Sequence, residues 1–425
     1  MMKKISRRSF LQACGVAAAT AALTACSGGK AETDKKDDAH EAITFMAPYK
    51  EVEAFIEQVH SVYPEVNIEV VPYSGDNTTT CLQNMFAAGD LPDVCTLTYY
   101  DPQIDLVSDK LLDLSGYDFT DNYVESRLQD VFDNGAIYLL PSTYNCYGIT
   151  YNKTLLKKYG WELPNSFAEL EVLAANAKEA GVDLCLPQIQ YPGSGFQYLC
   201  NIADADFLGT LDGRLWQKDY LSGKANVSNT PGMMQAMAYV QKWKDIGMLN
   251  GSGDALDDNV TRQRMAEGNT LFLMGGTNGI VEADGNADQF GLMPFLSEDG
   301  TQNVFVLNVN RFYGLNKKLK QSPQKLEDAL KVMRVLSTVA GTSALQPATT
   351  LKSSLLPIKG AKADGTYYAD IADALNAGNT APFIYSGWEN TVVTTGLKML
   401  DFIKGNATME DVIRQLDEDQ DSVVN

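Results

Sequence analysis

The sequence predicts an α/β protein with two lobes. Residues 42–48 form an apolar run typical of a buried strand, and apolar residues then recur at helical spacing from Val52 to Tyr63. Residues 66–70 alternate between apolar and polar, as a strand does, and the order strand, helix, strand indicates a parallel βαβ unit. The roughly 385 residues of the body exceed the usual size of a single core, so two lobes are expected.

The first 25 residues have the order of an export signal. A basic start without acidic residues precedes a small, apolar stretch from residue 15 to residue 25. The basic residues are Lys3, Lys4, Arg7 and Arg8. This stretch is shorter than the roughly 20 apolar residues that cross a bilayer as a helix, so a transmembrane anchor is the weaker interpretation. Residues 6–11 resemble the twin-arginine export signature, and the general secretory route is the alternative.

A cysteine stands at the border between this apolar stretch and a polar segment. The residues Leu23, Thr24, Ala25 and Cys26 resemble the lipobox of bacterial lipoproteins, whose cysteine accepts a diacylglycerol and becomes the new N-terminus. The resemblance implies that Cys26 holds the mature chain on a membrane through buried acyl groups. The charged, Gly-containing segment from residue 26 to residue 41 is expected to be a disordered tether.

The composition disfavours several classes of function. Without its signal the chain has 30 basic and 54 acidic residues, a balance that disfavours nucleic acid and anionic lipid as partners. Of the two histidines, His40 falls in the expected tether and His60 on an amphipathic helix, so a Ser-His-Asp triad is not supported.

The cysteines of the body support neither a zinc site nor a complete disulfide framework, because they are odd in number and lack CxxC spacing. They are Cys81, Cys95, Cys146, Cys185 and Cys200. A single bridge between Cys185 and Cys200 is left open.

The pattern continues along the first half of the body. A helix that contains Met85 ends at Gly89, and a third strand follows from residue 93 to residue 98. Ligands of such sheets bind beyond the carboxyl ends of the strands. In this chain those ends are Tyr49, the loop 73–76 and residues 99–101.

Later segments give equally local predictions. A strand is expected to end near Tyr151, with a helix from Lys153 that stops at Gly160, and a turn at Gly268 leads into a strand at 270–274. A further helix face is expected to be an ordinary apolar face rather than a cofactor site. It comprises Met233, Met234, Met237, Tyr239, Val240 and Trp243.

Six sequence strings in order resemble family 1 extracellular solute-binding proteins, the sugar-capturing lipoproteins of ABC importers, of which the maltodextrin-binding protein is one type. The first three are "MFAAGDLPDV", "GAIYLLP" and "GITYNKTLLKKYGWELPNSFAEL". The last three are "RMAEGNTLFLMGGT", "FGLMPF" and "FIKGNATMEDV". Together they cover nearly the whole body.

This resemblance implies a two-lobed, type II periplasmic-binding-protein-like fold, with each lobe discontinuous in sequence and the two joined by hinge strands. By analogy, one lobe takes residues 42–145 and 308–345. The other takes residues 146–307 and 346–425. The lobes would close around a small-molecule carbohydrate and deliver it to the permease subunits of an ABC importer, with the protein acting as a monomer.

A sugar site needs aromatic faces together with carboxylate, amide or Arg partners. We expect these on the strand-end loops, near the crossing between lobes, and after the strand that ends with two glycines, where the family's frequent Trp is replaced. The candidates are Tyr49, Tyr73, Asp76, Tyr99, Tyr100, Asp101, Tyr144, Asn145, Thr277, Asn278, Arg311 and Trp388. Arg311 and Trp388 are included because neither lies on an obvious apolar face.

No cofactor is expected, because the sequence lacks a Walker-type loop and its glycine pairs lack the GxGxxG context of a dinucleotide site. A surface carbohydrate-active enzyme and a structural surface lipoprotein remain weaker alternatives. Within the binding class, a non-sugar solute is the alternative to a mono- or oligosaccharide.

Overall fold

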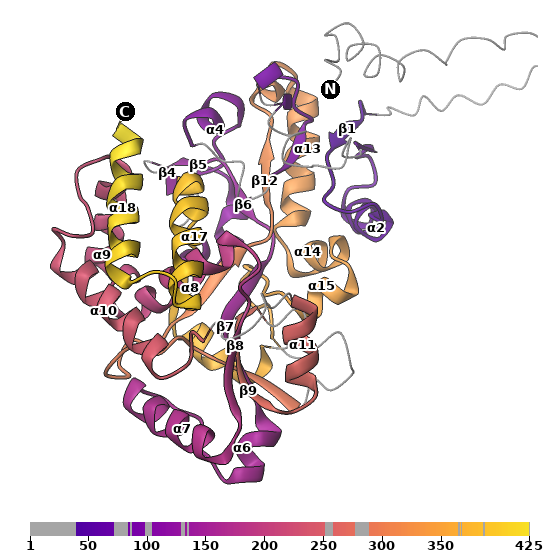
Figure 1. The fold of residues 1–425 in the computed structure, drawn as a ribbon. Coiled ribbons are helices and arrows are strands. Elements are labelled where there is room, and N and C mark those ends of the chain that lie inside the picture. The colour runs from indigo at the N-terminus through magenta and orange to yellow at the C-terminus, as the bar shows by residue number, and fades with distance from the viewer. Residues whose placement is uncertain are drawn as a thin grey trace, which may run out of the picture. The chain divides into compact units, whose positions relative to one another are not determined.

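The computed structural model contains two mixed β-sheets, each packed against its own helices (Figure 1). It describes residues 40–71, 84–85, 87–97, 104–128, 132–133, 136–250, 258–276, 289–363, 366, 368–385 and 387–424. The predicted α/β class is confirmed by this arrangement.

The first sheet has the strand order β2, β1, β3, β12, β6. Its strands are β1 (Ile43–Phe45), β2 (Ile68–Val70), β3 (Val94–Leu97), β6 (Leu140–Pro141) and β12 (Phe312–Leu315). β1 is parallel to β2 and β3, whereas β12 is antiparallel to β3 and β6. With α2 (Glu53–Val62) between β1 and β2, the predicted strand, helix, strand order is present.

Three helices cover the apolar residues of the first sheet: α2, α13 (Pro323–Leu336) and α14 (Val339–Leu345). Phe45 of β1 packs against Phe55 of α2, with ring centroids 5.6 Å apart, and Met333 of α13 lies in the same buried cluster. All three side chains are inaccessible to solvent. Burial of such side chains stabilises each by about 1.5–3 kcal/mol, which fixes the helices on the sheet.

The second sheet has the order β13, β11, β7, β9, β8, with β10 paired to β7. Its strands are β7 (Tyr144–Asn152), β8 (Asp183–Pro187), β9 (Thr270–Gly276), β10 (Phe290–Met293), β11 (Phe305–Val309) and β13 (Thr380–Pro382). The nine-residue β7 is central and antiparallel to β9, β10 and β11. Each sheet therefore draws strands from separate parts of the chain.

Two helices that pack beside the second sheet cross closely, because the glycines at their contact have no side chains. They are α8 (Pro192–Ala203) and α17 (Glu389–Lys404). A Cβ atom on Gly195 would lie 2.6 Å from the carbonyl oxygen of Gly396, and one on Gly396 would lie 2.2 Å from that of Pro192. Only glycine fits at either position.

The predicted boundary between β7 and α6 (Lys153–Tyr159) is confirmed in detail. Asn152 caps the helix, since its Oδ1 accepts a hydrogen bond from the backbone N–H of Leu155 at 3.1 Å. Gly160 ends the helix in the left-handed conformation, at φ 68°. The predicted turn at Gly268 is also left-handed, at φ 78°, directly before β9.

The remaining elements complete the two halves. The helices are α4 (Ile104–Lys110), α5 (Glu125–Leu128), α7 (Phe167–Ala180), α9 (Leu211–Leu221), α10 (Pro231–Asp245), α11 (Asp258–Ala266), α15 (Ala348–Lys352), α16 (Ala372–Asn376) and α18 (Met409–Val424). Short 3₁₀ helices span Asp118–Asn122, Lys317–Gln321 and Ala369–Ile371, a π-helical turn spans Asp204–Leu208, and β4 (Phe132–Asp133) pairs with β5 (Ala136–Ile137). No helix within the described ranges is both long enough and apolar enough to span a bilayer.

The structure corrects two sequence predictions and settles one question that the sequence left open. The folded body begins before residue 42, because His40 Nδ1 lies 2.7 Å from Asp328 Oδ2 and Glu41 pairs with Lys325 at 3.1 Å. The expected apolar helix face is α10, but Met234 is 38% exposed and does not belong to it. Cys185 and Cys200 are free and buried, so the bridge left open between them is absent.

The chain crosses between the two sheets at three places. Residues 142–143 join β6 to β7, and residues 310–311 join β11 to β12. At the third place, Leu355 follows α15 and forms two backbone hydrogen bonds with Tyr144, each of 2.8 Å. The lobe boundaries predicted above remain predictions, but these crossings position the candidate site.

Candidate functional site

Most of the predicted site residues lie outside the described part of the chain. These are Tyr73, Asp76, Tyr99, Tyr100, Asp101, Thr277 and Asn278, and Cys26 is also outside it. β3 ends at Leu97 and β9 ends at Gly276, directly before two of these groups. The described candidates are Tyr49, Tyr144, Asn145, Arg311 and Trp388.

Tyr49 follows the carboxyl end of β1 and is half-buried. Its hydroxyl donates a hydrogen bond of 2.7 Å to Oε1 of Gln346, which follows α14. Burial raises the pKa of Tyr49, while a hydrogen bond with Thr350 and the charge of Arg311 act in the opposite direction. Two predicted candidates distant in sequence, Tyr49 and Arg311, are therefore brought together.

Arg311 lies at the second crossing and is half-buried. One guanidinium nitrogen donates a 2.7 Å hydrogen bond to the carbonyl of Asn310, and its own carbonyl accepts one of 2.9 Å from Ser142 N–H. Arg311 forms no ion pair with any residue in the described ranges. Its charge is therefore available to a polar ligand group or to the neighbouring loops.

Asn310 ties the three crossings together. Its Nδ2 donates hydrogen bonds of 2.8 Å to Thr143 Oγ1 and 3.2 Å to Ser354 Oγ, and its backbone N–H donates to the Thr143 carbonyl at 2.8 Å. These residues and those around Tyr49 are called the crossing cluster below. Its members are Tyr49, Thr143, Asn310, Arg311, Gln346 and Ser354.

One polar atom of the crossing cluster is buried without a partner. Nε2 of Gln346 has no hydrogen-bond partner among the described residues, although Oε1 of the same amide accepts from Tyr49. Buried amide nitrogens are nearly always hydrogen-bonded in folded proteins. The same amide also acts on buried Tyr313: burial raises the pKa of Tyr313, and a hydrogen bond with Gln346 opposes that rise.

Tyr144 is a structural residue rather than part of an open surface. It is 1% exposed, its hydroxyl donates a 2.7 Å hydrogen bond to the Arg127 carbonyl, and the Arg127 guanidinium lies 5.5 Å from its ring centroid. Both the ring and the hydroxyl of Tyr144 are enclosed in this structure, so we leave this predicted ligand contact out of the site proposed below. Asn145 is half-buried and pairs with Asn308 in the β7–β11 register.

The interpretation of Trp388 is also corrected. Trp388 is 5% exposed and stacks on Tyr220, with ring centroids 4.5 Å apart and planes at 8°. Phe196 and Trp216 pack around it. Trp388 thus belongs to an apolar core contact at the start of α17, and we exclude it from the site proposed below.

Three aromatic residues that sequence reasoning missed lie beside the crossing strands. Tyr147 of β7 stacks on Phe383 at 5.5 Å, and Phe383 stacks on Tyr385 at 6.2 Å with an interplanar angle of 8°. All three are half-buried, and Tyr147 pairs with Gly276, the last residue of β9. We call them the aromatic row. The available signal was the two-residue spacing of Tyr147 from Asn145 and of Tyr385 from Phe383.

The aromatic row and the crossing cluster share one face of the β7–β11 pair. Side chains two residues apart lie on the same face of a strand, so Tyr147 and Asn145 of β7 project to one side. Thr143, in the connection directly before β7, is fully buried at the end of this row. Antiparallel pairing places Asn308 opposite Asn145, and Asn310 is bonded to Thr143. Over about 13 Å of strand, this face changes from aromatic to amide and hydroxyl groups.

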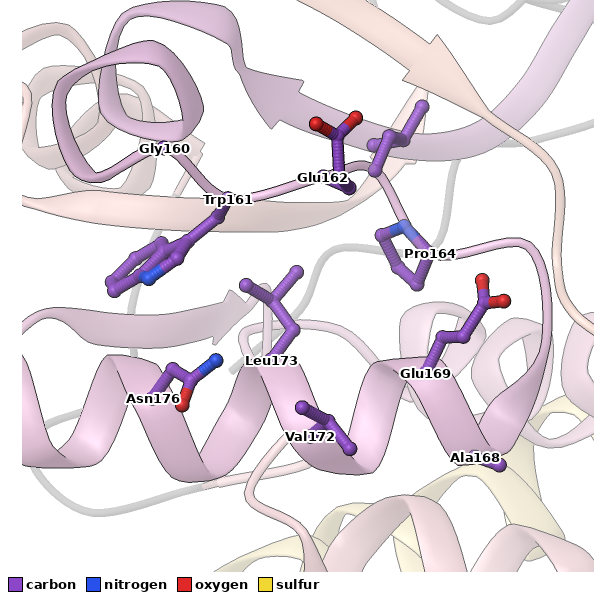
Figure 2. Close-up of a pocket in the computed structure, with 10 residues that line it drawn as sticks. Gly160, Trp161, Glu162, Pro164, Ala168, Glu169, Val172, Leu173 and Asn176 are labelled. Atoms are coloured by element: carbon purple, nitrogen blue, oxygen red, sulfur yellow. The ribbon is translucent and has the colours of Figure 1, made fainter.

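A separate pocket of about 440 Å³ lies between the segment 160–164 and the outer face of α7 (Figure 2). Figure 2 shows Trp161, Leu173 and Val172 along it, with the carboxylates of Glu162 and Glu169 at one side. Glu169 Oε2 is already engaged, since it accepts a 2.7 Å hydrogen bond from Asn165 N–H. The pocket shares no residue with the crossing cluster, and its apolar lining does not suit a polyhydroxyl ligand.

Among the described residues, no group of side chains is arranged for catalysis or for metal binding. Within the ranges that the structure describes, no group of three or more His, Cys, Asp or Glu residues could hold a metal ion. The buried thiols are unreactive by environment, since burial raises the pKa of Cys185 to about 12. Two α/β sheets, three crossings and a polar and aromatic face define a two-lobed ligand-binding protein.

Comparison with known proteins assigns the family. Residues 40–343 match the model for the bacterial extracellular solute-binding protein family, and the chain belongs to this family. Its members act outside the cytoplasm.

Individual relatives are distant in sequence. The "Multiple sugar-binding protein" of Streptococcus mutans is 26% identical over 162 residues, which span 37% of this chain and only 38% of that relative. A family 1 extracellular solute-binding protein from Bifidobacterium longum subsp. infantis has a TM-score of 0.76 at 19% identity, over 90% of this chain and 99% of that one. The sugar-binding protein MalE from Xanthomonas citri has a TM-score of 0.69 at 18% identity, over 90% and 97% of the two chains. These structures confirm the two-lobed, type II periplasmic-binding-protein-like fold.

Proposed function

We propose that this protein captures a mono- or oligosaccharide where its two lobes meet and delivers it to the permease subunits of an ABC importer. The observation that carries the proposal is the shared face of the aromatic row and the crossing cluster. The relatives from Streptococcus mutans and Xanthomonas citri are both named as sugar-binding proteins, which supports the proposal.

The chemistry of this face suits a sugar. Pyranose rings present flat C–H faces, which pack on aromatic rings such as Tyr147 and Phe383, and a rim of hydroxyls that requires fixed polar partners. Arg311, Asn145 and the Tyr49 hydroxyl supply donors and acceptors of this kind. A charged donor forms the stronger bonds, so Arg311 is the main orienting group in the proposal.

The loops outside the described ranges complete the proposed site. Tyr73 and Asp76 follow β2, Tyr99, Tyr100 and Asp101 follow β3, and Thr277 and Asn278 follow β9. Because β1, β2 and β3 are parallel, the loops that follow them begin at the same end of the first sheet as Tyr49. Asp101 would add a carboxylate acceptor and the tyrosines further stacking faces.

The two lobes are proposed to comprise residues 40–145 with 308–345, and 146–307 with 346–425, the start being moved to His40 because it pairs with Asp328. The crossings at residues 142–143 and 310–311 are the hinge in this proposal, since both connect a strand of one sheet to a strand of the other. Closure on a ligand would reduce the radius of gyration measured by solution scattering. An unchanged scattering profile at saturating ligand would argue against a closing hinge.

The mature protein is proposed to be a monomer tethered to the membrane by a lipid on Cys26. Only a thiol accepts the diacylglycerol, so Cys26→Ala should abolish labelling by radioactive palmitate in the producing cell. Label retained by the variant would disprove the assignment.

The proposal excludes turnover of the captured sugar, because the family consists of solute-binding proteins and the site offers no described nucleophile with a base.

A thermal-shift screen of the purified mature chain against neutral sugars, amino acids and peptides tests the proposed function. A ligand at 100 times its Kd stabilises the folded chain by about 2.7 kcal/mol, a shift of a few degrees. Stabilisation by a non-sugar solute alone would favour the alternative ligand class, and product formation from the bound sugar would favour an enzyme.

A further inference from the structure

A second pocket, far from the aromatic row in sequence, is surrounded by lysines. It has a volume of about 620 Å³ and lies between the end of α4 and the 3₁₀ helix Lys317–Gln321. Its basic residues are Lys110, Lys317, Lys318 and Lys320, and its one acidic residue is Asp109. We call these four residues and their cavity the lysine pocket.

One carboxylate outside the pocket senses these lysines: burial raises the pKa of Asp113, but hydrogen bonds from Ser115 and Ile137 and the charge of Lys320 lower it. Lys318 Nζ donates a 2.6 Å hydrogen bond to the Gly89 carbonyl, and Lys317 Nζ donates one of 3.2 Å to the Ser108 carbonyl. None of the four lysines forms an ion pair within the described part of the chain. In a protein with 54 acidic and 34 basic residues, this is a local reversal of charge.

The lysine pocket lies at the end of the first sheet where the folded body begins. β1 and β3 are parallel, so Glu41 before β1 and Leu91 before β3 are at the same end. β12 arrives there in the opposite direction, and Asn316 N–H donates a 2.9 Å hydrogen bond to the Asp93 carbonyl. Leu91 and Asn316 both line the pocket.

An ion-pair bridge ties the start of the body to this end. Lys325 Nζ lies 3.1 Å from both Glu41 Oε1 and Asp93 Oδ2. The segment from Cys26 to Ala39 can span at most about 50 Å when fully extended. A lipid on Cys26 would therefore allow the start of the folded body to lie at most about 50 Å from the membrane surface.

We infer that the lysine pocket docks on anionic phospholipid headgroups beside the root of the tether. The inference rests on the lipid anchor of the proposed function. The net negative charge of the whole chain does not prevent this contact, because charges farther away than a Debye length of about 8 Å are largely screened. Each lysine close to an anionic surface strengthens the attraction. The cavity of about 620 Å³, lined by four lysines, is large enough for a phosphate headgroup.

This contact has a consequence for capture. Tyr49 follows the carboxyl end of β1, at the opposite end of the sheet from the lysine pocket. Docking through the lysines thus directs the proposed sugar site away from the bilayer, where solutes arrive. Delivery to the importer then requires release of the pocket from the lipid, so the contact is a resting orientation.

Vesicle co-sedimentation tests the inference without the natural lipid. The mature chain carrying Cys26→Ser is mixed with vesicles of phosphatidylglycerol and phosphatidylcholine at 3:7, or of phosphatidylcholine alone, in low and in physiological salt. The test variant combines Lys110→Gln, Lys317→Gln, Lys318→Gln and Lys320→Gln. The matched control combines Lys157→Gln, Lys178→Gln, Lys224→Gln and Lys404→Gln, which removes the same charge at exposed positions elsewhere.

The wild type should prefer the anionic vesicles, with binding that weakens as salt rises. The partition coefficient of the test variant on anionic vesicles should fall at least about tenfold. The control variant should keep the wild-type value. Equal losses in both variants, or no preference of the wild type for anionic vesicles, would overturn the inference. A rise in binding on deletion of residues 27–38, abolished by the four pocket substitutions, would overturn the assignment of lipid as the resting occupant, because the tether would then fill the pocket in the intact chain.

Failure of this inference is distinguishable from failure of the proposed function. The four substitutions lie outside the crossing cluster and the aromatic row, so sugar binding by the test variant should equal that of the wild type. Loss of palmitate labelling in Cys26→Ala tests the anchor separately, and the vesicle assay does not require that anchor.

Discussion

The hydroxyl of Tyr49 donates a 2.7 Å hydrogen bond to Oε1 of Gln346, across 297 positions of sequence. The bond joins the carboxyl end of β1 to the end of α14, close to Arg311. It orients both the tyrosine ring and the amide whose Nε2 is unpaired. Any ligand group that binds beside Arg311 therefore meets a preorganised pair of polar side chains.

Tyr49→Phe should weaken sugar binding about two- to tenfold, because one neutral hydrogen bond contributes roughly 0.5–1.5 kcal/mol. Calorimetry with the sugar identified by the thermal-shift screen measures the change. Tyr159→Phe is the matched control, since Tyr159 is exposed at the end of α6 and belongs to neither the crossing cluster nor the aromatic row. Equal affinities of Tyr49→Phe and the wild type would remove Tyr49 from the site.

Tyr147→Ala should cost at least about fivefold in affinity, because an aromatic contact contributes roughly 0.5–1.5 kcal/mol beyond burial. It also removes the stack with Phe383, which positions the rest of the aromatic row. Tyr147→Phe keeps the ring and should retain most of the affinity. If the Phe and Ala variants bind equally, stacking on Tyr147 does not contribute.

Trp388→Ala should act on stability, with a loss of about 3–5 kcal/mol in the free energy of unfolding. The substitution leaves a cavity against Tyr220, Phe196 and Trp216. Urea unfolding followed by circular dichroism measures it, and the folded fraction should still bind sugar with wild-type affinity. A variant of normal stability but impaired binding would return Trp388 to the list of ligand contacts.

Asp204→Asn should stabilise the protein more at pH 8 than at pH 5. Burial raises the pKa of Asp204 well above its ordinary value, although the charge of Arg214 opposes the shift, and Oδ2 has no partner among the described residues. A carboxyl whose pKa is raised in the folded state stabilises the fold below its unfolded pKa. That contribution is lost as the pH rises through the folded value.

Asparagine cannot ionise, so the difference in unfolding free energy between Asp204→Asn and the wild type should grow with pH. Urea denaturation at both pH values gives this difference. Asp212→Asn, at an exposed position of α9, is the control and should show no such trend. A difference that is constant between pH 5 and pH 8 would mean that Asp204 does not titrate in this way.

Local patterns in the sequence predict much of the fold. The apolar run of β1, the helical spacing of α2, and the cap pair Asn152 and Gly160 of α6 each depend on residues within a few positions of one another. The folded structure keeps these helices and strands, because the tertiary contacts favour the same local structure as the sequence does.

The site was predictable only in part, because the face to which a side chain points depends on distant partners. Tyr144 and Tyr147 both lie on β7, but pairing with β11 and β9 places one in a closed core and the other in the aromatic row. Trp388 follows a turn and has no apolar periodicity before it. Trp388 is buried because it stacks on Tyr220, which lies 168 positions earlier in the sequence. No local pattern can reveal such a contact.

The central claim is that the site between the lobes holds a carbohydrate through both aromatic and polar contacts. Isothermal titration of the purified mature chain with a panel of neutral mono- and oligosaccharides tests it most directly. We predict saturable binding of one sugar per chain, weakened by Tyr147→Ala and by Arg311→Ala but not by Tyr159→Phe. Absence of binding to every sugar of the panel, with binding of an amino acid or peptide at the same site, would contradict the account.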